Sequence, residues 1–282
     1  MTQSSPLSPL ISTDALAALM DDPTLRIVDG SWHLDGRDAQ ADFDQARLPG
    51  AVFFDLEAVS DHSSDLPHML PTAAAFAEAV GALGIAATDT IVIYDTVGLR
   101  SAPRVWWTFR LMGATNVRVL DGGLPLWRAE GRPVVSGPAQ TPTPASFAAS
   151  RRSDAVADLP MVLGALTGEA QILDARPAAR FAGQAAEPRA GLRSGHMPGA
   201  LNLPFLSVIG DDGRLLEPEA LRARFTQAGV AFDRPIITSC GSGVTAAILT
   251  LALATLDEPS RLYDGSWAEW GSRPDTPVVS EA

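Results

Sequence analysis

The chain has 282 residues, of which 46% are hydrophobic and 19% charged, which is typical of a globular protein and not of a disordered one. Its net charge of −12 argues against non-specific binding to nucleic acids or anionic membranes, because both need basic surface. All 21 basic residues are arginine, and the lack of lysine excludes Schiff-base chemistry and a phosphate-loop lysine.

Short apolar runs alternate with helical patterns along the chain. In chain order they are a run ending at Asp29, a helical pattern over 71–84, the run 90–95, a run ending at Asp174, a helical pattern over 217–229, the run 234–240 and an apolar helix over 246–254. The patterns at 71–84 and 217–229 end in glycine, a usual helix stop, and Pro218 stands where a first-turn proline is tolerated. This alternation predicts an α/β fold with parallel sheets flanked by helices.

The second half of the chain repeats the first. RLPGAVFFDL at 47–56 matches HMPGALNLPFL at 196–206, and VRVLDGGLPLW at 117–127 matches SRLYDGSWAEW at 260–270. Asp29 lies 145 residues before Asp174, and Asp95 lies 145 residues before Cys240. Four matches in one order at nearly one offset indicate a duplicated domain. We expect an N-terminal copy over 10–138, a linker rich in Pro, Ser, Thr and Ala over 139–157, and a C-terminal copy over 158–280.

Cys240 is the only cysteine, so no intramolecular disulfide can form. The N-terminal stretch MTQSSPLSPLISTDALAAL lacks the pattern of a secretory signal, and the longest apolar run, AAILTLALATL, is too short to span a bilayer. We therefore expect a soluble cytoplasmic protein that acts neither on nucleic acid nor on a membrane. One cysteine and four scattered histidines show no ligand spacing, so we expect no metal and no cofactor.

Cys240 stands between a strand and a helix, in the loop CGSGVT. Gly241 and Gly243 allow backbone conformations that other residues avoid, and the following helix turns its positive end toward the loop. Backbone N–H groups that point at the sulfur would stabilise the thiolate, which is the nucleophilic form. The same position in the first copy is Asp95, so only the second copy can perform thiol chemistry. A buried packing cysteine is the alternative.

The loop CGSGVTA, the segment YDGSWAEW and the duplicated architecture resemble the two-domain rhodanese superfamily, and within it the 3-mercaptopyruvate sulfurtransferases. The resemblance implies that Cys240 takes sulfur from a donor as a persulfide and passes it to a thiol or to cyanide. It also implies that Gly241, Gly243, Val244 and Thr245 surround the substrate at the cysteine. Thiosulfate is the alternative donor, but the superfamily's thiosulfate enzymes have basic residues in the loop, whereas Gly241 and Ser242 are neutral.

A cluster of arginines suits a carboxylate donor. Arg176, Arg180, Arg189 and Arg193 accompany a single acid, Glu187, within 175–196, so that this segment carries a charge of +3. The resemblance implies that Arg180 and Arg189 bind the carboxylate and keto groups of the substrate, and a guanidinium fits a carboxylate with two hydrogen bonds.

The resemblance further implies a proton relay near the cysteine. Ser242 can relay a proton or donate to a developing oxyanion. His68, in the motif HMLP, is expected beside it, together with an acid from the stretch FFDLEAVSD. The family has aspartate where Glu57 stands, and Asp61 is the other candidate. His196 precedes a Pro-Gly turn that both copies share, so we expect it to be structural.

Other thiol functions fit less well. A cysteine phosphatase needs an arginine after five intervening residues, and a redox sensor needs a resolving cysteine, which this chain lacks. Because Cys240 stands alone, the sulfur acceptor must come from outside, as thioredoxin, a small thiol or cyanide. The resemblance favours a monomer.

Overall fold

The computed structural model describes residues 7–281 and divides into two compact units. The first contains residues 7–55 and 73–151, and the second contains residues 56–72 and 152–281. The segment 56–72 therefore packs with the second unit, although it stands within the first copy of the sequence repeat. The first six residues of the stretch inspected for a secretory signal lie outside the described chain.

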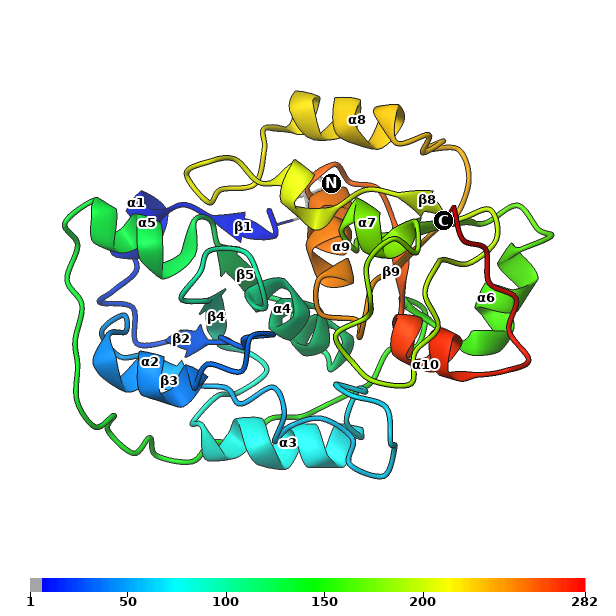
Figure 1. Ribbon diagram of the computed structural model, residues 1–282. Coiled ribbons are helices and arrows are strands. Elements are labelled where there is room, and N and C mark those ends of the chain that lie inside the picture. The colour runs from blue at the N-terminus through cyan, green and yellow to red at the C-terminus, as the bar shows by residue number, and fades with distance from the viewer. Residues whose placement is uncertain (1–6, 282) are drawn as a thin grey trace, which may run out of the picture. The chain divides into compact units, whose positions relative to one another are not determined.

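The first unit holds a five-stranded parallel sheet in the order β1-β5-β4-β2-β3. The strands are β1 (Leu10–Ile11), β2 (Leu25–Asp29), β3 (Val52–Phe53), β4 (Thr90–Tyr94) and β5 (Val117–Leu120). The helices are α1 (Thr13–Ala17), α2 (Ala39–Gln45), α3 (Ala73–Ala82), α4 (Ala102–Leu111) and α5 (Gly123–Ala129) (Figure 1).

The second unit repeats this topology, with the strand order β6-β10-β9-β7-β8, again parallel. The strands are β6 (Val156–Ala157), β7 (Gln171–Asp174), β8 (Leu201–Asn202), β9 (Ile236–Ser239) and β10 (Ser260–Tyr263). The helices are α6 (Leu159–Ala165), α7 (Ala178–Phe181), the 3₁₀ turn η1 (Phe205–Val208), α8 (Pro218–Gln227), α9 (Ala246–Thr255) and α10 (Ser266–Ser272) (Figure 1). The predicted α/β class and the duplication are confirmed.

The sequence signals act as expected at the ends of the helices. Pro218 is the first residue of α8, and α3 and α8 are followed by Gly84 and Gly229 in left-handed conformations (φ +73° and +91°). Such conformations favour glycine, because a Cβ would crowd the backbone. Helix α9 is apolar on all sides and almost wholly buried, and it packs against β9, β10 and η1. This packing fixes the start of α9, and with it the loop that carries Cys240.

Each sheet has its own core. In the first unit, Trp127 packs with side chains of β2, β4 and α2, and in the second Trp267 and Trp270 pack with β7, β9 and β10. Trp106, Trp107, Trp127 and Trp270 are all buried. Within residues 7–281, no helix combines the length and the apolar character needed to cross a membrane.

Candidate active site

Cys240 lies directly after β9, at the carboxyl end of the strand, and its residue is only 1% exposed. The start of α10 holds its backbone: the N–H of Cys240 donates to Ser266 Oγ (3.3 Å), and its carbonyl accepts the N–H of Trp267 (2.9 Å). Gly243 takes a left-handed conformation (φ +78°), which turns the loop back toward the cysteine before α9 begins. The sulfur is thus held in a fixed position at a loop of backbone amides.

The equivalent loop of the first unit shows what this geometry binds. There the carboxylate of Asp95 accepts the N–H groups of Val97 (3.1 Å), Arg100 (2.7 Å), Ser101 (3.0 Å) and Ala102 (2.9 Å). Its glycine, Gly98, has the same φ of +78° as Gly243. A loop of this kind therefore gathers several backbone donors around an anion at the position that follows the central strand.

In the second unit three of the four matching donors have no acceptor within residues 7–281, whereas the fourth, the N–H of Ala247, donates to the carbonyl of Val244 (3.3 Å). The N–H groups of Ser242, Thr245 and Ala246 correspond to those of Val97, Arg100 and Ser101, and none of the three has an acceptor among residues 7–281. Buried backbone donors normally find a partner, so a set of three beside one sulfur marks a place for a negatively charged group.

A line of three side chains leads away from this loop. Ser242 Oγ lies 3.0 Å from His68 Nδ1, and His68 Nε2 lies 2.8 Å from Glu57 Oε1. The side chain of His68 is fully buried, whereas that of Glu57 is 57% exposed. Since an ionised carboxylate only accepts, we assign the proton to Nε2, which leaves Nδ1 to accept the Ser242 hydroxyl.

Asp61, the other acid considered from the sequence, makes hydrogen bonds within the loop that carries His68. Its carboxylate accepts the N–H (2.9 Å) and the hydroxyl (2.7 Å) of Ser63, and its own N–H donates to the carbonyl of Met69 (2.9 Å). It thus shapes the loop that carries His68, and Glu57 is the acid in contact with the imidazole. His68 has a left-handed backbone (φ +60°), which costs a non-glycine residue about 1–3 kcal/mol and persists only when neighbouring contacts hold it.

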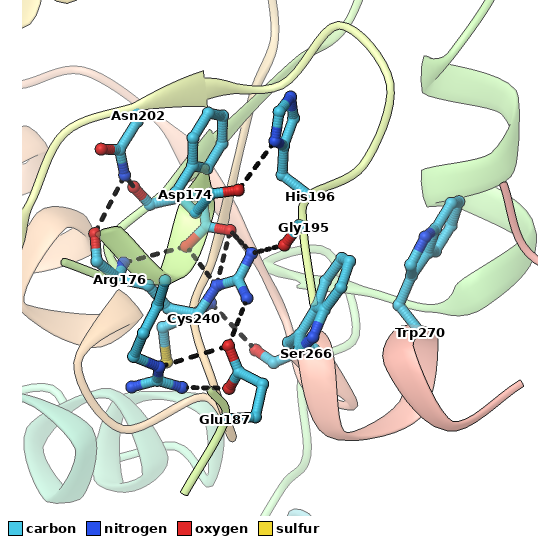
Figure 2. Close-up of polar contacts among 12 residues, drawn as sticks. Asp174, Arg176, Glu187, Gly195, His196, Asn202, Cys240, Ser266 and Trp270 are labelled. Carbon is cyan, nitrogen blue, oxygen red and sulfur yellow. Dashed lines mark hydrogen bonds and ion pairs between the residues drawn. The ribbon is translucent and has the colours of Figure 1, made fainter. Parts of the chain in front are cut away.

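The arginines differ in how far the protein already uses them. Arg176 is buried, holds both oxygens of Asp174 and reaches Glu187 Oε1 at 2.8 Å (Figure 2). Its guanidinium also lies over the ring of Trp267. Although burial opposes it, the two carboxylates raise the pKa of Arg176 above its ordinary value. Arg193 donates to the carbonyls of Trp270, Gly271 and Thr276 and is structural.

Arg180 and Arg189 lie nearer the cysteine. Arg180 forms an ion pair with Glu187, and its Nη2 would lie 3.2 Å from a Cβ placed on Gly241. Arg189 is half-buried and makes no hydrogen bond or ion pair with any part of the described chain. Burial lowers the pKa of Arg189, while the negative charges of Cys240 and Glu57 act in the opposite direction.

The charge of this cluster is smaller than the segment count suggests. Asp174, Arg176, Arg180 and Glu187 compensate one another, which leaves Arg189 as the guanidinium of the cluster without an ionic partner in the described chain. The count of +3 omitted Asp174, which stands just before the segment, and included Arg193, which binds carbonyl oxygens. Within residues 7–281 the cluster therefore offers one uncompensated positive charge, which suits a monoanion.

The remaining predicted residues also lie at the loop. Val244 is buried, and Thr245 is the residue before the first turn of α9.

His196 stacks on Phe181 and contacts its carbonyl oxygen through Nδ1 (2.8 Å), which fits a structural role. Sequence reasoning did not assign Ser266, Asp264 or the bridging role of Glu187. The only sequence signal for Glu187 was its place as the single acid among four arginines.

No group of three or more metal-binding side chains gathers anywhere within residues 7–281.

Two stretches of the chain, 12–130 and 162–273, match the model of the rhodanese-like domain. The 3-mercaptopyruvate sulfurtransferase of Escherichia coli (strain K12) is 45% identical over 272 residues, which cover 95% of this chain and 96% of that protein. The thiosulfate sulfurtransferase of Bos taurus is 42% identical over 257 residues, which cover 89% and 86% of the two chains.

Among solved structures, the crystal structure of SseA from Escherichia coli, described as a 3-mercaptopyruvate sulfotransferase with the rhodanese fold, is 43% identical to this chain. It superposes with a TM-score of 0.85 over 93% of this chain and 99% of that one. Relatives that carry either donor in their names thus match at similar identity, so overall similarity leaves the choice of donor to the site itself.

Proposed function

Since this chain belongs to the rhodanese-like domain family, we propose that it is a sulfurtransferase that takes sulfur from 3-mercaptopyruvate on Cys240, releases pyruvate and passes the sulfur to a thiol or to cyanide. The observation that carries the proposal is a set of three amides beside Cys240, at Ser242, Thr245 and Ala246, which have no acceptor within residues 7–281. They stand in the loop whose counterpart binds the Asp95 carboxylate. A persulfide anion on Cys240 places its charge where those donors converge.

The first half-reaction is a displacement at sulfur. The Cys240 thiolate attacks the sulfur of mercaptopyruvate, the S–S bond forms and the C–S bond breaks. The electron pair of that bond moves to the carbon and gives the enolate of pyruvate. The enolate takes up one proton, and the proton of the former substrate thiol leaves the new persulfide, so the step is balanced without any added oxidant or reductant.

The line Ser242–His68–Glu57 supports this proton traffic. The Ser242 hydroxyl, two residues from the cysteine, can donate toward the keto oxygen or the enolate while His68 Nδ1 accepts from it. Glu57 holds the imidazole in the tautomer that leaves Nδ1 open, and stabilises the imidazolium if it forms. Asp61 shapes the loop that carries His68 through its bonds to Ser63 and Met69.

The charges at the site favour 3-mercaptopyruvate as the sulfur donor. Arg189 supplies the one guanidinium of the cluster that is uncompensated within residues 7–281, and a carboxylate binds to it with charge-assisted hydrogen bonds. Arg180 is held by Glu187 beside Gly241, and we assign it to the keto group. Mercaptopyruvate brings a single carboxylate, whereas thiosulfate is a dianion and meets no cation within the loop 240–245. Thiosulfate is the second candidate, because the bovine relative carries that name at 42% identity.

The second half-reaction needs a partner from outside. A thiolate or cyanide attacks the outer sulfur of the persulfide, and Cys240 leaves as the thiol or thiolate. No second cysteine exists to accept the sulfur within the chain, so thioredoxin or a small thiol is the proposed acceptor. We further propose that the protein acts as a cytoplasmic monomer, and that the first copy, with Asp95 in its loop, is inactive.

Two measurements test the proposal. Intact mass after treatment with mercaptopyruvate should show one added sulfur atom in the wild type and none in Cys240→Ser. An unchanged wild-type mass would refute the persulfide. Turnover with the two donors at equal concentration should favour pyruvate release from mercaptopyruvate, and a preference for thiosulfate would overturn the donor assignment while leaving the persulfide intact.

A further inference from the structure

The relay is carried by a segment that belongs to the second unit only through its packing. His68 and Glu57 lie in residues 56–72, a loop without helix or strand, yet His68 must meet Ser242 at a distance of 3.0 Å. Such a loop needs an anchor near His68. Asp264 provides one: its Oδ2 accepts the N–H of Leu70 at 2.9 Å, two residues beyond the histidine.

Asp264 is itself fixed. Only 5% of it is exposed, and it stands between β10 and α10, where its N–H donates to the carbonyl of Ala157. Two and three residues further on, Ser266 and Trp267 hold the backbone of Cys240. The short stretch 264–267 therefore holds both groups. Ser266 and Trp267 hold the backbone of Cys240, and Asp264 holds the loop that carries His68.

The backbone of His68 explains why an anchor is needed. Its left-handed conformation (φ +60°) is unfavourable for a residue with a Cβ, and so depends on the contacts around it. The Asp61 N–H to Met69 carbonyl bond closes the loop on itself, but both partners belong to the same segment. The Asp264–Leu70 bond instead ties the loop to the β10–α10 junction, against which Cys240 is also held.

We propose that Asp264 is a positioning residue for sulfur loading: its carboxylate holds Leu70 and thereby keeps His68 in line with Ser242. The inference rests on the proposed function. In this role Asp264 acts through the backbone of Leu70 and not on the reacting atoms, so its removal should slow the step that needs the relay and leave substrate binding largely unchanged. Discharge of a preformed persulfide by cyanide needs no relay, because cyanide attacks as an anion.

The test separates loading from discharge. In Asp264→Ala, the rate of pyruvate release at saturating mercaptopyruvate should fall roughly 10- to 100-fold, because a hydrogen bond to a charged acceptor is lost. The KM should change by less than about threefold. Discharge by cyanide should keep its wild-type rate. Asp264→Asn, whose amide oxygen still accepts from Leu70, should lose only about threefold. Asp275→Ala, which removes an exposed carboxylate from the same unit, is the control.

A double-variant cycle makes the result specific. His68→Ala should slow loading, and adding Asp264→Ala or Asp264→Asn should slow it no further, because both act through the same imidazole. Three results would each overturn the inference. The first is that the two substitutions slow loading independently, so that their effects multiply. The others are an equal loss of the loading and discharge rates in Asp264→Ala, or a normal loading rate in that variant. If Asp264→Ala does not fold, the Asp264→Asn cycle decides. Failure of the wild type to gain sulfur refutes the proposed function instead, before any variant is compared.

Discussion

At the scale of single residues, the site is defined by the polar groups that have no partner within residues 7–281. Arg176 and Arg180 share Glu187, whose side chain is only 2% exposed, and Arg176 also pairs with Asp174, so the two positive charges are already compensated. Arg189 is half-buried and has no ionic partner in the described chain. A guanidinium that has lost part of its hydration without gaining a carboxylate gains most from a ligand that brings one.

Arg189→Ala should therefore raise the KM for mercaptopyruvate by roughly 10- to 100-fold, the value of a charge-assisted hydrogen bond, with a smaller change in kcat. Steady-state kinetics of pyruvate release measures both. Arg273→Ala removes an exposed arginine paired with Asp275 and should leave the KM unchanged. A KM for Arg189→Ala within twofold of the wild type would mean that the carboxylate binds elsewhere.

At the scale of structural elements, the carboxyl end of β7 depends on a buried ionic network. Arg176 joins Asp174, at the end of the strand, to Glu187 and to the carbonyl of Gly195 (Figure 2). These bonds bring the segment that carries Arg180 and Arg189 back to the sheet. The network thus shapes the substrate side of the site from beneath it.

Arg176→Met should lower the free energy of unfolding of the second unit by about 3–5 kcal/mol, because it leaves the buried carboxylate of Asp174 without its guanidinium and removes one of the two that Glu187 contacts. Urea unfolding followed by tryptophan fluorescence measures the loss, since Trp267 lies against this guanidinium. Arg222→Ala breaks an exposed pair with Glu258 and should cost no more than about 1 kcal/mol. Equal losses in the two variants would contradict a structural role for the network.

The loop 240–245 is a second element with a specific requirement. Gly243→Ala should destabilise the protein by about 1 kcal/mol, because a Cβ is unfavourable at φ +78°, and should slow sulfur loading by turning the amides away from Cys240. Gly164→Ala is the matched control: Gly164 lies in α6 with no atom within 4 Å of an added Cβ, so that change should stabilise the helix slightly. The free energy of unfolding and the rate of sulfur loading are measured for both variants. If Gly243→Ala and Gly164→Ala changed these two quantities alike, position 243 would not require glycine.

The elements also show what the sequence can and cannot predict. The strand, loop and helix around Cys240 follow from local patterns, because apolar runs and glycines act over a few residues. The choice of Glu57 over Asp61 does not, since it depends on the left-handed turn at His68 and on a bond to Asp264, 194 residues away from Leu70. The pairing of Arg176 with Asp174 was not predicted, because the segment whose charges were considered begins at residue 175, just after Asp174.

At the scale of the whole molecule, two copies of one topology have specialised in opposite ways. Each ends its second strand with a buried aspartate, Asp29 or Asp174, but only Asp174 has an arginine two residues further on. Ser31 stands at that place in the first copy, and its N–H donates to the Asp29 carboxylate (2.9 Å). In the second copy Arg176 pairs with Asp174, whereas in the first copy burial raises the pKa of Asp29 to about 6.

This difference predicts that neutralising the two aspartates has opposite effects on stability. Between pH 3.8 and about 6, Asp29 is protonated in the folded first unit but ionised when unfolded, so stability falls as pH rises and the penalty is complete above pH 6. The penalty amounts to about 3 kcal/mol. Asp29→Asn should therefore stabilise the first unit at pH 8 and change little at pH 4, as measured by hydrogen exchange of the β2 and β4 amides. Asp174→Asn should instead destabilise the second unit at pH 8, because Arg176 loses its ion pair with Asp174. If Asp29→Asn stabilised the first unit equally at both pH values, burial of the charge would not be the cause of the effect.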